Sequence, residues 1–358
     1  MTAVPESDPS GRSQADAVRP GYARATVCQV SPTRCPARTR LYRNGALESE
    51  GFPAAEISDH VTDPDVTVWL DLRGPDLDDL AVISEEFGLH PLAVEDATHE
   101  HQRAKLDRYR THLFLSAYGV SLDETTGELA TSEVAAFVTE RALITVRKED
   151  GIDIDGLVRH WDDSPELAKH GVGYLVQGLL DYLVDSHFGA VQSLDDALDT
   201  LEDQLFADAP ADRDVQRRSF ELRKSLVLLR RVVLPMREVV NTLMRRDLHI
   251  VDDAMQPYYQ DVYDHVLRAT EWTESLRDLV TTILETNLTI QGNRMNTISK
   301  KVTSWAAIVA VPTLITGYCG MNLPYPGFAK PWAVIFFTGL MVVVSFVLYL
   351  SFKRKDWL

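Results

Sequence analysis

Two uncharged apolar runs near the C-terminal end constrain this chain more than any other feature of its sequence. Residues 302–319 read VTSWAAIVAVPTLITGYC and residues 332–352 read WAVIFFTGLMVVVSFVLYLSF, which are 18 and 21 residues without a charged side chain. A helix needs about 20 apolar residues to cross the hydrocarbon core of a membrane, so each run predicts a transmembrane helix. The first run is short, and we expect its helix to extend back through residues 294–301. A buried helical hairpin in a soluble protein is the alternative interpretation.

Basic residues around the two runs predict the orientation of the chain in the membrane. Lys300 and Lys301 precede the first run and three basic residues at 353–355 follow the second, whereas the connecting loop has only Lys330. Loops rich in lysine and arginine stay in the cytoplasm. We therefore expect a multi-pass protein of the cell (plasma) membrane with both termini cytoplasmic. Residues 1–20 have no apolar run, so no signal peptide is predicted.

Acidic and basic residues are divided unevenly along the chain. The 358 residues include 36 Lys+Arg and 53 Asp+Glu, a net charge of −17. Residues 292–358 contain seven basic residues and one acid, a net of +6, so residues 1–291 hold 29 bases and 52 acids, a net of −23. An acidic body argues against a nucleic-acid partner, which would need a basic surface to neutralise phosphates. It can instead attract cations.

The sequence has neither an ATP-binding motif nor a recognisable catalytic motif. No GxxxxGK[ST] loop occurs, so the sequence does not predict ATP-driven pumping. No convincing pair of nucleophile and general base occurs either. We therefore predict that the protein is not an enzyme.

Secondary-structure patterns divide the chain into segments. Runs rich in β-forming residues at 66–72, 112–120, 133–140 and 142–147 surround a helical pattern at 77–87. After about residue 165 the strand signals vanish, and residues 170–207 and 213–247 are expected to form two helices joined by the Pro/Asp-rich turn FADAPADRD. A third helix is expected to start near Pro257, and no helix-ending signal precedes Gly292, so this helix is expected to continue into the first apolar run. These patterns predict an α+β membrane protein. Its expected segments are a disordered tail (1–20), a cytoplasmic α/β domain (21–165), a cytoplasmic helical hairpin (166–250), a stalk helix that runs into the first transmembrane helix (251–320), an outer loop (321–331), the second transmembrane helix (332–352) and a basic cytoplasmic C-terminus (353–358).

Small and polar residues recur along one face of the first span. Going back from Gly320 in alternating steps of three and four, the chain has Gly317, Thr313, Ala310, Ala306, Thr303, Ser299 and Asn296. This period of 3.5 residues places them on one face of a helix. In a membrane such a stripe indicates either close packing of helices or the lining of a pore. Two spans cannot enclose an aqueous path, so a pore would require an oligomer with the first span innermost and the second facing lipid.

Several segments of the chain resemble the CorA family of divalent-cation channels. The segment PTLITGYCGMN (312–322) ends in the Gly-Met-Asn triplet that is the hallmark of this family, and a second span and the basic end FKRKDWL follow it. Further matching segments are GLHPLAVEDATHEHQRAKL (88–106), LRKSLVLLRRVVLPMREVV (222–240) and QDVYDHVLRATEW (260–272). The resemblance covers about residues 40–358. It implies a funnel-shaped homopentamer with an N-terminal cytoplasmic α/β domain and a long stalk helix that forms the pore.

The resemblance also implies a selectivity filter at the outer mouth of the pore. It assigns this role to Gly320, Met321 and Asn322, with the amide oxygens of Asn322 facing a hydrated ion. It places Asn296 at the inner mouth and Thr313 within the pore. Mg²⁺ gives up its water reluctantly, so a ring of amide oxygens that contacts the hydrated ion suits this cation.

Regulatory cation sites between neighbouring cytoplasmic domains are a further implication. The resemblance assigns them to Asp96 and Asp261, with Glu95 and Asp181 as additional contributors. Mg²⁺ would then be both the transported and the regulatory ion. Hard cations take oxygen ligands, and carboxylates from two subunits repel each other unless an ion bridges them. We therefore expect Mg²⁺ at Asp96 and Asp261 to hold the closed state.

The function that the resemblance implies is a passive Mg²⁺ channel driven by the membrane potential, with Co²⁺ or Ni²⁺ as further ions. A zinc transporter of the same superfamily is one alternative, and a membrane-anchored oligomeric sensor or scaffold without transport is another. Three departures from the family pattern bear on the choice. Cys319 directly precedes the triplet, where the family often has tyrosine, and Tyr318 stands one residue earlier. Ser299, Val302 and Ala310 occupy positions where bulky residues of the family often form a constriction. The outer loop has no acidic residue, although such residues are common in the family.

Overall fold

The computed structural model of the protein describes residues 34–99, 103–123, 125–206, 212–245, 248, 250–321, 327 and 330–358. The predicted tail at 1–20 lies outside this part, as does most of the predicted outer loop at 321–331. The strands are β1 (Ala37–Arg43), β2 (Ala46–Glu50), β3 (Val66–Arg73), β4 (Lys105–Arg108), β5 (Leu113–Leu122), β6 (Leu129–Val138) and β7 (Ala142–Arg147). The helices are η1 (Ala54–Glu56), α1 (Ile57–His60), α2 (Leu77–Phe87), α3 (Pro91–Thr98), α4 (Ile154–Asp162), η2 (Pro165–His170), α5 (Val172–Phe206), α6 (Asp212–Leu243), α7 (Gln256–Cys319) and α8 (Pro331–Arg354).

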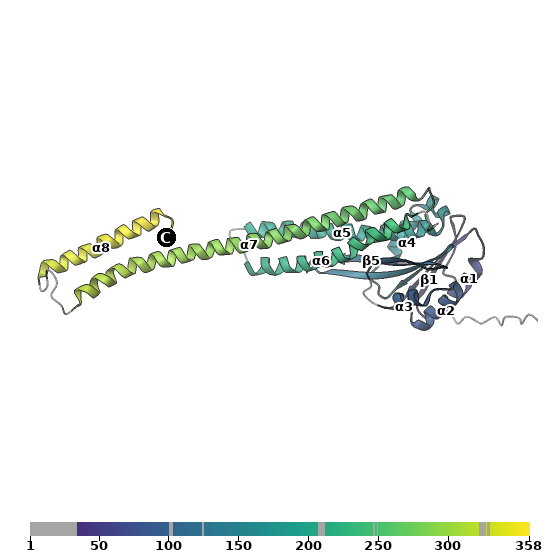
Figure 1. Cartoon of the computed structure of the whole chain (residues 1–358), viewed down its shortest axis with the longest axis horizontal. Coiled ribbons are helices and arrows are strands. Elements are labelled where there is room, and N and C mark those ends of the chain that lie inside the picture. The colour runs from purple at the N-terminus through teal and green to yellow at the C-terminus, as the bar shows by residue number, and fades with distance from the viewer. Residues whose placement is uncertain are drawn as a thin grey trace, which may run out of the picture.

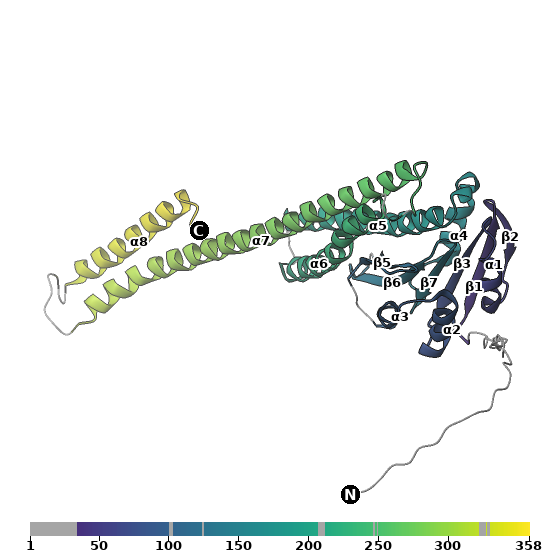
Figure 2. The same cartoon turned by 45° about the vertical axis from the view of Figure 1, so that its right-hand side comes forward.

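One mixed sheet of seven strands forms the N-terminal domain, in the order β2-β1-β3-β7-β6-β5-β4. β3 and β7 run parallel, and the other paired strands run antiparallel. Side chains alternate between the two faces of a strand. In β3, Val68 and Leu70 therefore join the core beneath α2 and α3, whereas Trp69 joins the core beneath α4 and α5. The sheet thus separates α1–α3 from the long helices (Figures 1 and 2).

Local signals set both ends of α2 and direct the chain into α3. The carboxylate of Asp76 accepts a hydrogen bond from the backbone of Asp79 at 2.8 Å, and the Asp79 side chain accepts one from the backbone of Asp76 at 3.3 Å. This reciprocal cap begins the helix. Gly88 ends it with φ +59°, a left-handed conformation that glycine adopts without strain. The helix predicted at 77–87 is confirmed.

Helices α5 and α6 pack on one face of the sheet, and α7 packs on both of these helices (Figure 1). A polar contact adds to their apolar core: the Tyr259 hydroxyl of α7 donates to the carbonyl oxygen of Gly173 in α5 at 2.8 Å. α7 has 64 residues, which at a rise of 1.5 Å per residue is about 95 Å. Its C-terminal part extends beyond the other helices, and α8 folds back along it (Figure 1).

The C-terminal part of α7 and the whole of α8 are long and apolar enough to cross a membrane. Large apolar side chains on both are open to solvent in the single chain: Leu314 is 75% exposed and Ile335 76% exposed. A buried hairpin of a soluble protein would not leave such side chains uncovered. The exposure therefore favours a lipid or protein environment around both helices.

Candidate functional site

The membrane part of α7 remains helical across a proline. Pro312 has no N–H to offer the carbonyl group one turn earlier, which normally weakens a helix. The carbonyl that loses its donor is that of Ile308; one turn later the hydroxyl of Thr316 donates to the carbonyl oxygen of Pro312 at 2.9 Å, which adds a hydrogen bond on the C-terminal side of the proline. After the last helical residue, the backbone N–H of Gly320 still donates to the carbonyl oxygen of Thr316 at 2.9 Å. The helix therefore reaches the Gly-Met-Asn triplet.

The stripe of small and polar residues faces away from α8. Its seven helical members are all exposed in the single chain: Asn296, Ser299, Thr303, Ala306, Ala310, Thr313 and Gly317. Ser304 is 1% exposed, and Ile308 and Ile315 are half-buried where α8 packs on α7. Residues two apart on a helix point about 200° apart, so Ala310 lies opposite Ile308 and Thr313 opposite Ile315. The stripe is thus open on the side of α7 that α8 leaves uncovered.

An open groove follows the outer half of this stripe. Its lining residues are Ala306, Val309, Ala310, Thr313, Leu314, Gly317, Tyr318 and Met321. The hydroxyl of Thr313 donates to the carbonyl oxygen of Val309 at 2.9 Å, so its oxygen remains free to accept a hydrogen bond from the groove. Met321 is 41% exposed at the end of the groove, next to the Gly320 cap. Asn322, the predicted filter residue, lies outside the described residues.

Two of the predicted regulatory acids lie in one cluster between α5 and α7. Asp181 and Asp185 of α5 and His265 of α7 each place one potential ligand atom within 4.8 Å of the others, and within the described ranges this is the one such group. Asp261 joins its edge, with Oδ1 3.9 Å from Nε2 of His265. Two carboxylates and an imidazole are a donor set suited to a divalent cation.

The charges in this cluster influence one another. Burial raises the pKa of the Asp185 carboxyl, and the nearby charge of Asp181 raises it further. His160 of α4 lies with Nε2 3.3 Å from Oδ2 of Asp181, and this hydrogen bond raises the pKa of the imidazole. A bound cation would relieve the repulsion between the two carboxylates.

Sequence reasoning did not identify Asp185 and His265. Asp185 stands four residues after the predicted ligand Asp181 and lies on the same face of α5. His265 stands four residues after the predicted ligand Asp261 and lies on the same face of α7. That spacing was a usable signal within each helix. Only the packing of α5 against α7 shows that the two faces meet.

The other two predicted acids lie on the opposite side of the sheet. Glu95 and Asp96 belong to α3, which Figure 2 shows away from α7. Glu95 is exposed, and Asp96 is half-buried with Oδ2 2.6 Å from Nζ of Lys105. A single chain therefore does not bring Asp96 and Asp261 together. A cation site that uses both would have to lie between two chains.

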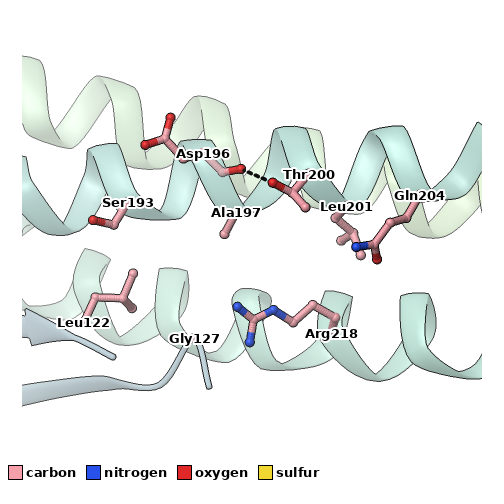
Figure 3. Close-up of a pocket in the computed structure, with 9 residues that line it drawn as sticks. All are labelled: Leu122, Gly127, Ser193, Asp196, Ala197, Thr200, Leu201, Gln204 and Arg218. Atoms are coloured by element: carbon pink, nitrogen blue, oxygen red, sulfur yellow. Dashed lines mark hydrogen bonds between the residues drawn. The ribbon is translucent and has the colours of Figure 1, made fainter. Parts of the chain in front are cut away.

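A further cavity of about 370 Å³ lies between α5 and α6, beside the turn that joins β5 and β6 (Figure 3). Arg218 of α6 enters it and donates to the carbonyl oxygen of Thr126. The Thr200 hydroxyl donates to the carbonyl oxygen of Asp196 at 2.9 Å. Both side chains therefore already form hydrogen bonds within the protein, and we do not include this cavity in the ion pathway.

Comparison with known proteins identifies the family. A model of the family described as CorA-like Mg2+ transporter protein matches residues 64–354. The chain belongs to the CorA family. It is 30% identical over 301 residues to the cobalt/magnesium transport protein CorA of Thermotoga maritima, which covers 83% of this chain and 85% of the relative. The chain is therefore a metal-ion transporter and not an enzyme, as the sequence predicted.

Two further similarities concern the fold and the transported ion. The complete structure of the CorA magnesium transporter from Methanocaldococcus jannaschii superimposes with a TM-score of 0.74 at 22% identity, over 90% of this chain and 98% of that one. This CorA fold confirms the predicted α/β domain, stalk helix and two C-terminal spans. The zinc transport protein ZntB of Yersinia pestis is 22% identical over 260 residues, 72% of this chain and 78% of the relative.

Proposed function

We propose that this CorA protein is a passive Mg²⁺ channel that also admits Co²⁺ or Ni²⁺. In this proposal five copies form a funnel, α7 lines the pore and α8 faces lipid. One observation carries the proposal: the stripe of small and polar residues is exposed on the side of α7 opposite to α8. Close packing of α7 on α8 would have placed the small residues between those two helices. A pore helix instead needs them on its free side.

The side chains of the stripe suit a hydrated ion. Alanine and glycine leave space for the water shell. The hydroxyl of Thr313 donates its proton to the carbonyl oxygen of Val309, so its oxygen can accept a hydrogen bond from the water around the ion. No charged side chain occurs along the stripe from Asn296 to Gly317, so nothing there would strip the ion of water. The amide of Asn322 would form the outer ring. Mg²⁺ keeps its water shell tightly, and this arrangement lets it do so.

The membrane potential supplies the driving force in this proposal. In this proposal both termini lie in the cytoplasm, as the basic residues that flank both spans predict, so entry is movement toward the negative side. A divalent ion that crosses 100 mV gains about 4.6 kcal/mol, enough for roughly 10³-fold accumulation. No ATP-binding motif is then required.

Gating in this proposal uses Mg²⁺ between neighbouring domains. Asp261 is 66% exposed at the edge of the α5–α7 cluster, and Glu95 is exposed on α3, so both can reach another chain. Asp96 of one chain and Asp261 of the next would share an ion that holds the closed state. Loss of that ion leaves carboxylates facing each other, and their repulsion separates the subunits.

Ion flux into proteoliposomes tests the transport function. We expect Mg²⁺ to enter liposomes that contain the wild type, and Asn322→Ala or Asn296→Ala to reduce the flux at least several-fold. Asn293→Ala is the matched control, since Asn293 is an exposed asparagine of the same helix that does not belong to the stripe. Undiminished Mg²⁺ flux in Asn322→Ala would contradict the filter role. Absence of flux for Mg²⁺, Co²⁺, Ni²⁺ and Zn²⁺ would instead favour a sensor or scaffold.

Limited proteolysis tests the gating site. Mg²⁺ should protect the wild type against protease, and Asp261→Asn should require more Mg²⁺ for the same protection. Asp264→Asn is the control, because Asp264 is exposed one turn away and its carboxylate accepts from Gln260. Equal protection of the two variants would exclude Asp261 as a regulatory ligand.

Zinc transport is the second candidate function. The similarity to ZntB supports it, as does the imidazole of His265 in the cation cluster, because imidazole binds Zn²⁺ better than Mg²⁺. Comparison of Zn²⁺ and Mg²⁺ flux in the same liposomes, with and without a proton gradient, separates the two. Zn²⁺ flux that exceeds Mg²⁺ flux and follows the proton gradient would establish the zinc function.

A further inference from the structure

α6 is a basic helix in an acidic protein. It has eight Lys and Arg residues against four Asp and Glu residues, whereas the whole chain has a net charge of −17. Like charges that gather on one helix repel each other unless an anion or an acidic side chain lies nearby. The arginines of α6 that have no acidic side chain nearby therefore mark where this helix presents positive charge.

A cleft of about 460 Å³ lies where α6 passes the edge of the sheet formed by β4, β5 and β6. Arg230 and Arg231 of α6 line it, together with Arg103 just before β4. Arg230 is held by Glu274 of α7 at 3.3 Å. Within the part of the chain that the structure describes, Arg103 and Arg231 are exposed and neither forms an ion pair. Two guanidinium groups thus border one cleft without an acidic partner there.

The wall of the cleft offers a different kind of surface. Tyr118 of β5 and Pro235 of α6 are both buried residues that line it, and they provide an aromatic and an apolar face. Pro235 has no N–H, so the carbonyl group of Arg231, one turn earlier, lacks its usual helical donor. The cleft therefore combines a positive rim, an apolar wall and an available hydrogen-bond acceptor.

We propose that this cleft binds a phosphorylated small molecule of nucleotide size. The planar guanidinium group donates two parallel hydrogen bonds to phosphate oxygens, a geometry that Arg103 and Arg231 can both use. The volume falls in the range of small-molecule sites, about 300–1,000 Å³, and exceeds what one phosphate needs. Tyr118 and Pro235 would contact the non-phosphate part of the ligand. This site is separate from the stripe on α7 and from the acidic cluster, and it stands whether or not the proposed transport function holds.

Calorimetric titration of the full-length protein in detergent tests the proposal, with ATP, AMP and inorganic phosphate as probes. EDTA keeps free divalent ions low, since ATP would otherwise remove Mg²⁺ from the acidic sites. We expect ATP to bind the wild type, and the double variant Arg103→Gln/Arg231→Gln to weaken binding roughly tenfold or more. Arg223→Gln is the matched control, because Arg223 is an exposed arginine of the same helix outside the cleft. It should leave the affinity unchanged.

Three results would overturn the proposal: no binding of ATP to the wild type at millimolar concentration, an equal loss in Arg223→Gln, or full binding in the double variant. Inorganic phosphate that binds as tightly as ATP would overturn the nucleotide-size assignment. Arg231→Lys keeps the charge and loses the planar fork, so we expect it to weaken ATP binding to an intermediate degree. The melting temperature of each variant without ligand shows that it is folded, and ATP should raise that of the wild type.

Discussion

Oδ2 of Asp96 lies 2.6 Å from Nζ of Lys105, so within one chain the predicted regulatory carboxylate already has a cationic partner. Lys105 also lies 3.1 Å from Asp107. Both Asp96 and Lys105 are partly open to solvent, with side chains 22% and 30% exposed. A metal ion that binds Asp96 must therefore compete with the ammonium group of Lys105.

Removal of this competitor should strengthen Mg²⁺ binding. In Lys105→Met the apolar stem remains and the charge is lost, so we expect half-maximal protection from protease at about two- to fivefold lower Mg²⁺, the range for a partly exposed ion pair. Arg110→Met, a change at an exposed basic residue nearby, is the control. A higher Mg²⁺ requirement in Lys105→Met would show that Lys105 positions Asp96 and does not compete for it.

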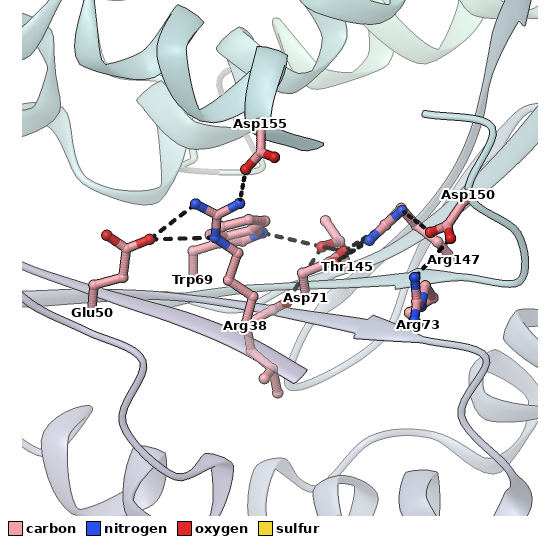
Figure 4. Close-up of polar contacts among 10 residues, drawn as sticks. Arg38, Glu50, Trp69, Asp71, Arg73, Thr145, Arg147, Asp150 and Asp155 are labelled. Carbon is pink, nitrogen blue, oxygen red and sulfur yellow. Dashed lines mark hydrogen bonds and ion pairs between the residues drawn. The ribbon is translucent and has the colours of Figure 1, made fainter. Parts of the chain in front are cut away.

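Asp71 of β3 and Arg147 of β7 form a buried pair across the parallel strands (Figure 4). Nη2 of Arg147 lies 2.7 Å from Oδ2 of Asp71, and the side chains are 8% and 3% exposed. Asp71→Ala leaves a buried guanidinium group without its main partner, so we expect a loss of about 3–5 kcal/mol of stability. Asp150→Ala removes an acid that is 68% exposed, and should cost below about 1 kcal/mol. Thermal unfolding of both variants measures the difference, and equal shifts would contradict it.

His187 should make stability depend on pH. It is fully buried, its Nε2–H donates to the carbonyl oxygen of Tyr118 at 2.8 Å, and burial lowers the pKa of the imidazole from 6.5 to about 4. Between these values the unfolded chain binds a proton that the folded chain does not. This contribution is therefore complete above pH 6.5 and is lost as the pH falls toward 4, by up to about 3 kcal/mol.

The matching experiment is thermal unfolding between pH 7.5 and 4.5. His187→Gln keeps a donor for the Tyr118 carbonyl and cannot be protonated, so its stability should fall less steeply with acid than that of the wild type. His99→Gln, at an exposed histidine, should keep the steep fall. The same slope in His187→Gln and the wild type would contradict the assignment.

Two threonines of α7 give a paired test of the pore-facing side. Thr313 lies on the stripe and Thr316 lies off it, and both hydroxyls donate to a backbone carbonyl oxygen at 2.9 Å. Valine keeps the shape of the side chain and removes the oxygen. We expect Thr313→Val to lower Mg²⁺ flux several-fold because hydration water loses an acceptor, and Thr316→Val to change it little. Flux that falls more in Thr316→Val would place the pore on another side of α7.

The long helices and the spans could be predicted because their signals are local. In a bilayer each backbone polar group must be satisfied within its own segment, so an uncharged run of about 20 residues has few alternatives to a helix. The stripe could be found for the same reason, since a 3.5-residue period defines one helix face. Helix α2 was predictable from its apolar spacing and from Gly88, which supplies the left-handed end.

The candidate metal cluster depended on contacts between distant segments. Asp181 and His265 are far apart in sequence and meet only because α5 packs against α7. The sequence by itself determined the long helices, which of these can enter a membrane and which face of α7 is small and polar. Only the tertiary structure decided that α8 covers the opposite face and that Asp96 lies across the sheet from Asp261. The physical reason is that helix periodicity arises from neighbours along the chain, whereas packing depends on apolar surfaces brought together from separate segments.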